Sequence, residues 1–90
     1  MKVTFDPAKR QATLESRGLD MALAGEVFSG PTLTVPSDRR GENRFFTLGY
    51  LNSRMMVMVW TPRNGDRRII SMRKAHESEQ KLYGPRLGRP

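Results

Sequence analysis

The sequence predicts a single α+β domain in which helices pack on one face of an antiparallel sheet, with the element order β-α-α-β-β-β-β-α. Helix-forming segments lie near both ends of the chain, and strand-like segments lie between them. Two of these strands are joined by Asn64-Gly65, the strongest short signal for a β-hairpin. Ninety residues suffice for one domain, which we expect over residues 1–84, with a flexible basic tail over 85–90.

The first elements are predicted to be a strand and two helices. Residues 2–6 alternate polar and apolar side chains, as a half-buried strand does. Asp6-Pro7 supplies the residues preferred at the cap and first position of a helix, which we expect to end before Gly18. Asp20 then caps a second helix over residues 21–28, whose apolar stripe at helical spacing is expected to pack in the core.

Strands are predicted for the middle of the chain, over residues 32–35, 44–51, 54–61 and 67–72, with a charged loop over 37–43. The third of these is apolar at successive positions, so we expect it to lie centrally in the sheet. In the fourth, strict alternation places Arg67, Ile69, Ser71 and Arg73 on one face and Arg68, Ile70 and Met72 on the other. A last helix is expected over residues 74–83, stopped by Gly84-Pro85.

The composition excludes several classes of protein. The chain has no cysteine, which rules out disulfides, zinc–thiolate sites and cysteine nucleophiles. His76 is the single histidine, so we expect no metal site and no other cofactor. The longest apolar run, residues 55–60, is far shorter than the ~20 residues that cross a bilayer. Asp6 stands where a signal peptide would be apolar, so we expect a cytoplasmic protein without a membrane partner.

The positive charge is concentrated in the second part of the chain. The sequence holds 16 basic and 9 acidic residues, a net charge of +7. The charges cancel over residues 1–36, so the whole excess lies in residues 37–90, where arginine dominates. The arginine side chain presents a planar fork of donors that matches a phosphate. This distribution favours a polyanionic partner, either nucleic acid or an acidic protein, over a basic surface that serves only solubility.

Three segments together resemble the signature blocks of BrnT-family toxins. They are Phe-Asp-Pro-Ala-Lys at residues 5–9, Arg-Phe-Phe-Thr-Leu-Gly-Tyr at 44–50 and Arg-Ile-Ile-Ser-Met-Arg-Lys-Ala at 68–75. The family shows an opening D-P-x-K, a central E-x-R followed by an L-G strand, and R-I-I-S-x-R-x-A before the last helix. The order and spacing match over residues 3–83, and the last block is the most specific.

The resemblance implies a RelE-like fold and a ribonuclease that halts translation. It also implies a BrnA-type antitoxin that binds the toxin in a hetero-oligomer. Operator DNA would then be contacted only through this antitoxin. Where the family reads Lys-His-Gly at the end of the first helix, this chain reads Ser16-Arg17-Gly18, so that histidine is absent. His76, three residues before Glu79, is a candidate to supply the missing acid or base, with a solvated or structural histidine as the alternative.

Metal-free RNA cleavage requires removal of the 2′-hydroxyl proton, stabilisation of a pentacoordinate phosphate and protonation of the 5′-oxygen. We expect Arg73, at a strand end with little packing to lose, to be the central phosphate ligand. Glu79 and Tyr83 lie four residues apart and so share a helix face. The catalytic candidates are Arg73, Arg44, His76, Glu79 and Tyr83, and the RNA-binding candidates are Arg63, Arg67, Lys74 and Arg17.

Two other functions remain open. The absence of a histidine at residue 17 favours a catalytically weak module that acts with its antitoxin as a co-repressor on operator DNA. A basic RNA-binding or ribosome-associated protein without toxicity would need no partner gene.

Overall fold

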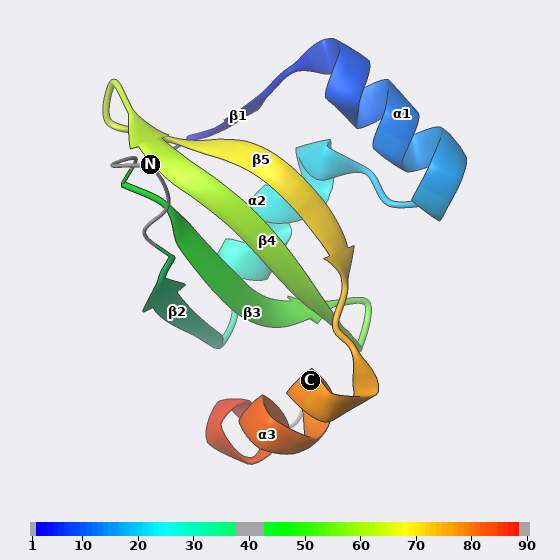
Figure 1. Ribbon diagram of the computed structural model, residues 1–90, viewed down its shortest axis with the longest axis vertical. Helices are drawn as coiled ribbons and strands as arrows, with labels where there is room; N and C mark the ends of the chain where they lie inside the picture. The colour runs from blue at the N-terminus through cyan, green and yellow to red at the C-terminus, as the bar shows by residue number, and fades with distance from the viewer. Residues whose placement is uncertain (1, 38–42, 89–90) are drawn as a thin grey trace.

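The computed structural model describes residues 2–37 and 43–88, and it confirms an α+β domain with the predicted order of elements (Figure 1). The strands are β1 (Val3–Phe5), β2 (Thr32–Pro36), β3 (Phe45–Leu51), β4 (Arg54–Arg63) and β5 (Asp66–Lys74). The helices are α1 (Pro7–Arg17), the short 3-10 turn η1 (Met21–Leu23), α2 (Ala24–Phe28) and α3 (Glu77–Leu87). Most of the charged loop predicted over 37–43 lies outside the described residues.

The predicted helix caps are present. The Asp6 carboxylate accepts a hydrogen bond from the backbone N–H of Ala8 at 2.8 Å, which satisfies a donor that the helix itself leaves free. Gly18 ends α1 at a φ of 68°, a conformation that glycine adopts without strain. Asp20 caps η1 in the same manner as Asp6, accepting from the N–H of Ala22 at 2.9 Å. The sequence signals therefore set where these helices begin and end.

The sheet is mixed, so the prediction of an antiparallel sheet is wrong for one strand. The strand order is β1-β5-β4-β3-β2, and every neighbouring pair is antiparallel except β1 and β5, where Val3 lies opposite Arg67 in a parallel pair. Parallel neighbours need a long connection, and nearly the whole chain separates these two strands. No local signal such as a hairpin turn therefore specifies the direction in which β1 pairs.

Helices lie on both faces of the sheet, so the prediction that they share one face is wrong. On the α2 face, η1 and α2 pack against a cluster that includes Met56 and Trp60 of β4. On the opposite α3 face, Leu87 of α3 is buried with Met55 and Val57 of β4. Alternate residues of β4 thus enter two cores, which explains its continuous apolar run and confirms its central position.

Trp60 organises the core of the α2 face. Its ring stacks on Phe45 with centroids 5.0 Å apart and meets Phe28 edge-on at 5.8 Å. The indole N–H donates to the hydroxyl of Thr47 at 2.8 Å, and this hydroxyl also bonds to Thr34 at 2.8 Å. The fully buried Thr47 therefore satisfies the polar atom of the largest side chain in the core.

Helix α3 begins later and runs further than predicted. It starts at Glu77, because β5 continues through Lys74, and it passes Gly84-Pro85 to end at Leu87. Leu87 is buried on the α3 face, and the Tyr50 hydroxyl donates to the Gly88 carbonyl at 2.7 Å. These tertiary contacts outweigh the local stop signal, so the first residues of the tail expected over 85–90 form the last turn of α3.

Gly49 of β3 allows α2 to approach the sheet closely. A Cβ at this position would lie 2.6 Å from Val27 Cγ1 and 3.1 Å from Thr32 Cγ2. Val27 is completely buried, so it has little room to move aside.

We expect Gly49→Ala to destabilise the fold by about 1–3 kcal/mol, because the added methyl overpacks the contact between α2 and β3. In a domain of this size the melting temperature falls by roughly 4–8 °C for each kcal/mol of unfolding free energy that is lost. Thermal unfolding followed by circular dichroism measures this shift. Gly30→Ala is the matched control, since its Cβ would meet nothing nearer than the Val27 carbonyl at 3.9 Å. Equal melting temperatures for the two variants would contradict the close-approach interpretation.

Candidate functional site

A β-bulge in β5 decides which arginines share a face of the sheet. Val59 pairs with Ser71 but Trp60 pairs with Ile69, so Ile70 is an extra residue in the strand. The predicted strict alternation is therefore wrong. Beyond the bulge the order of faces is reversed, and Arg73 lies on the α3 face with Arg68, whereas Arg67 lies on the α2 face.

An arginine groove lies at the hairpin end of the α3 face. Its basic side chains come from the residue before β3, the end of β4, the beginning of β5 and the first turn of α1. The groove encloses about 200 Å³ and is lined by Asp6, Lys9, Arg44, Thr61, Arg63, Arg68, Ile69 and Ile70. The structure thus brings the candidates Arg44 and Arg63 together and adds Lys9 and Arg68 to them.

A second groove of about 280 Å³ lies between α1 and β5, and it shares Lys9 and Ile70 with the arginine groove. Arg17, at the end of α1, lines this second groove, and its Nη1 donates to the Met72 carbonyl of β5 at 2.8 Å. The two adjoining grooves therefore carry positive charge along β5 from the hairpin to the end of α1.

Arg73 is held by Glu79 of α3. Its Nη1 donates to Glu79 Oε1 at 2.7 Å and its Nη2 donates to Oε2 at 2.9 Å, a bidentate pair of partly buried side chains. This charge-assisted pair ties the end of β5 to the first turn of α3. The expectation that Arg73 has little structural role is therefore wrong.

Glu79 also holds His76, the N-cap residue of α3. The backbone N–H of His76 donates to Glu79 Oε1 at 2.7 Å, and the imidazole Nδ1 lies 3.6 Å from the same oxygen. The hydrogen bonds that Glu79 accepts from Arg73 and from the His76 backbone lower the pKa of Glu79 to about 2. The hydrogen bond to Glu79 raises the pKa of Arg73 in turn. A carboxylate this acidic is a poor proton acceptor near neutral pH, whereas the His76 side chain is 69% exposed and open to a substrate.

The remaining candidates lie apart from this centre. The Arg67 guanidinium stacks over the rings of Phe28 at 4.1 Å and Trp60 at 5.2 Å on the α2 face. Its buried Nε finds no hydrogen-bond acceptor among the residues that the structure describes. Tyr83 packs its ring against the apolar cluster of the α3 face, and Lys74 is exposed at the end of β5.

Two residues of the grooves were not among the sequence candidates. Lys9 belongs to the D-P-x-K block, so the motif carried a signal for it. Strict alternation in a regular strand predicts that Arg68 lies on the opposite face from Arg73. Only the bulge at Ile70 brings Arg68 and Arg73 to one face. Residues 66–74 contain no glycine or proline that would have predicted a bulge.

Within residues 2–37 and 43–88, no group of three or more His, Cys, Asp and Glu side chains is placed to hold a metal ion. No helix among those residues has the length and apolar character needed to cross a membrane.

Comparison with known proteins gives a family. A family model described as "Ribonuclease toxin, BrnT, of type II toxin-antitoxin system" matches residues 5–79. That match extends from the opening D-P-x-K block to Glu79 and so includes both the arginine groove and the Arg73–Glu79 pair. A search of curated proteins found no match to this sequence.

We expect Glu79→Gln to lower stability by about 1–3 kcal/mol at pH 7, because the charge that binds Arg73 is lost. The pKa of Glu79 is lowered in the folded protein, so its stabilisation is complete above the ordinary value near ~4.3 and disappears as the pH falls toward 2. Thermal melts of both proteins between pH 7 and pH 2 should therefore converge at the acid end.

Glu77→Gln is the control for this prediction, because Glu77 is 85% exposed and its pairing with Lys81 at 3.5 Å lies in solvent. A Glu79→Gln protein that melts with the parent at pH 7 would show that the pair with Arg73 does not stabilise α3.

Proposed function

This chain belongs to the BrnT family of ribonuclease toxins of type II toxin–antitoxin systems, and we propose that it is a cytoplasmic endoribonuclease that works without a metal ion. It cuts RNA, thereby inhibits translation, and is neutralised by a BrnA-type antitoxin. One observation carries this proposal. The Arg73–Glu79–His76 cluster lies on the same sheet face as the arginine groove. An RNA backbone bound along that face would therefore reach the acid–base group of this cluster.

RNA is proposed to lie along the α3 face beside β5. Arg44, Arg63 and Arg68 bind backbone phosphates in the groove, with Lys9 at its edge. Arg68 and Arg73 are five residues apart on one strand, at most roughly 17 Å at ~3.4 Å per residue. A short single-stranded segment would span that distance and place one phosphate beside Arg73. Arg17 and Lys74 extend the basic surface at its margins.

Arg73 is proposed to stabilise the charge that develops on the scissile phosphate. In the reaction the ribose 2′-oxygen bonds to phosphorus, the bond from phosphorus to the 5′-oxygen breaks, and a 2′,3′-cyclic phosphate remains. Two of the five guanidinium N–H groups of Arg73 bind Glu79 and a third donates to the Lys74 carbonyl, so the guanidinium plane is held in a fixed orientation and its remaining N–H groups face the phosphate. A preorganised donor of this kind favours the transition state because it needs no reorientation during the reaction.

His76 is proposed to accept the proton of the 2′-hydroxyl and to return it to the departing 5′-oxygen. Its imidazole is exposed, whereas the carboxylate beside it is too acidic to accept a proton near pH 7. Glu79 therefore acts as a positioning residue for Arg73 and His76, and Tyr83, one helical turn further along α3, positions the substrate.

One observation favours a second function, that of a catalytically weak co-repressor. Arg17 occupies the position of the histidine that the family usually has, and its guanidinium is bound to the Met72 carbonyl. An arginine at this position supplies a positive charge and hydrogen-bond donors but no hydrogen-bond acceptor. Cleavage of RNA then depends on His76. If His76 takes no part in cleavage, the chain would act as a co-repressor that contacts operator DNA only through its antitoxin.

Induced expression of this chain alone should arrest bacterial growth. We expect Arg73→Ala to remove most of this toxicity, because loss of one transition-state contact costs ~3–4 kcal/mol, or ~10²–10³ in rate. We expect His76→Gln to cut RNA far more slowly if His76 moves the protons. Growth after induction and the rate of cleavage of a labelled RNA measure both effects.

Arg86→Ala is the control, because Arg86 is an exposed arginine of α3 that lines neither groove. Circular dichroism melts of each variant separate loss of activity from loss of fold, since Arg73 also ties β5 to α3. Soluble parent protein that leaves growth unaffected would sink the enzyme proposal in favour of the co-repressor. A His76→Gln protein with the parent's rate would remove His76 from the mechanism.

The antitoxin is proposed to cover the α3 face with an acidic segment, in competition with RNA. We expect Arg44→Ala and Arg73→Ala to weaken antitoxin binding by about tenfold each, ~1.4 kcal/mol, and binding to slow as salt rises. Arg67→Ala is the matched control, because Arg67 lies on the opposite face over Phe28 and Trp60. Surface plasmon resonance measures these affinities, and equal binding by all three variants would place the antitoxin on another surface.

A further inference from the structure

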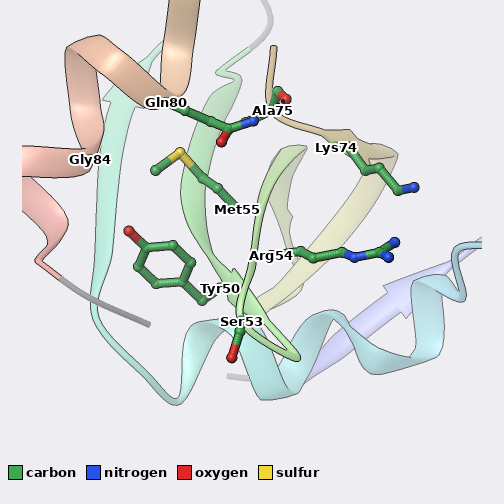
Figure 2. Close-up of a pocket in the computed structure, with 8 residues that line it drawn as sticks. All are labelled: Tyr50, Ser53, Arg54, Met55, Lys74, Ala75, Gln80 and Gly84. Carbon is green, nitrogen blue, oxygen red and sulfur yellow. Dashed lines mark hydrogen bonds between the residues drawn. The ribbon is translucent and has the colours of Figure 1, made fainter. Parts of the chain in front are cut away.

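A cavity that the proposed mechanism does not use opens between α3, the β3–β4 turn and the end of β5 (Figure 2). It encloses about 440 Å³, within the ~300–1,000 Å³ range of small-molecule sites. Its lining residues combine apolar, neutral polar and cationic side chains with no acidic one, and they are Tyr50, Ser53, Arg54, Met55, Lys74, Ala75, Gln80 and Gly84.

Two neutral polar side chains of this cavity, Tyr50 and Gln80, each present an oxygen that can accept a hydrogen bond. Gln80 Nε2 donates to the Ala75 carbonyl at 3.2 Å, which orients the amide so that its oxygen points toward Met55 and the interior (Figure 2). The Tyr50 hydroxyl proton is donated to the Gly88 carbonyl at 2.7 Å, so its oxygen is left with accepting lone pairs. A ligand that bonds to both of these oxygens must therefore donate hydrogen bonds.

The other surfaces of the cavity suit a planar ring that carries a phosphate. The Tyr50 ring and the Met55 thioether supply an apolar wall on which an aromatic ring packs (Figure 2). Arg54 and Lys74 line the side of the cavity away from Tyr50, and their charged ends point outward from its rim, where they would meet a phosphate that leaves the cavity (Figure 2). An unpaired nucleotide has both parts, a stacking base and a phosphate.

The position of the cavity connects it to the proposed cleavage centre. Lys74 follows Arg73 directly in the chain, and Arg73 Nη1 lies 3.2 Å from the Lys74 carbonyl. The Tyr50, Met55 and Gln80 side chains belong to the α3 face, on which the arginine groove also lies. The nucleotide next to a phosphate held by Arg73 would therefore reach this cavity.

We propose that the cavity binds the base of a single-stranded nucleotide next to the scissile phosphate and prefers guanine, an assignment of substrate specificity that rests on the proposed function. Guanine presents N1–H and its 2-amino group on one edge, which matches two acceptors. Adenine and cytosine each donate through a single amino group. Uracil donates through one N–H that lies between two carbonyl oxygens, and these oxygens repel the Gln80 oxygen.

Titration of the full chain with nucleoside 5′-monophosphates tests this preference without any cleavage. We expect guanosine monophosphate to bind about tenfold more tightly than uridine monophosphate. Inosine monophosphate, which lacks only the 2-amino group of guanine, should fall between them. Nuclear magnetic resonance should show the largest shifts at the Met55 methyl and the Gln80 side-chain amide. Equal affinities for the guanosine and uridine nucleotides, or shifts confined to the arginine groove, would overturn the proposal.

Two variants test the assigned groups. Gln80→Leu should reduce the preference for guanosine over uridine monophosphate to less than about threefold, whereas Gln11→Leu, on the exposed face of α1, should keep the parent's preference. Arg54→Ala should weaken both nucleotides equally, because it removes a phosphate contact. A Gln80→Leu protein that keeps the full preference would overturn the role of Gln80. If Gln80→Leu does not fold, the comparison of nucleotides on the parent still decides the proposal.

Failure of this assignment is distinguishable from failure of the proposed function. A protein that binds guanosine monophosphate in the cavity but cuts no RNA would overturn the ribonuclease and leave the base site in place. A protein that cuts RNA with no preference among bases beside the cut, and binds the nucleotides equally, would overturn the base site alone.

Discussion

The extra residue at Ile70 is the constraint on which the arrangement of charges depends. Because Val59 pairs with Ser71 and Trp60 with Ile69, β5 changes faces at this point. Without the bulge, Arg67 and Arg73 would lie together and Arg68 would lie behind the sheet. With it, Arg68 and Arg73 share the α3 face, and Arg67 is left to stack on the aromatic rings of the α2 face. Bulges commonly redirect side chains beside functional sites.

The two faces of the sheet differ in how completely they are covered. On the α2 face, η1 and α2 approach as closely as Gly49 permits and bury an aromatic core around Trp60. On the α3 face, a single helix covers only the end that holds Met55 and Leu87. The arginine groove lies at the hairpin end of that face, beyond the part that α3 covers. One sheet thus combines a closed aromatic core on one face with a cationic groove on the other.

The Arg73–Glu79 pair links stability to chemistry. It attaches α3 to β5, it makes the carboxylate too acidic to serve as a base, and it orients the guanidinium and His76 together. A phosphate that approaches Arg73 therefore meets a group already fixed in place, which lowers the cost of organising the site during the reaction. The same geometry means that the loss of either partner affects both the fold and the site.

The sequence by itself determined the elements that local chemistry specifies. The caps at Asp6, Gly18 and Asp20, the central apolar strand and the family motifs all gave correct predictions, because each depends on neighbouring residues. Only the tertiary structure decided the parallel pairing of β1, the placement of α3 on the second face, its extension past Gly84-Pro85, and the bulge at Ile70. These depend on contacts between residues distant in the chain, whose packing outweighs local preference and leaves no signal in the sequence nearby.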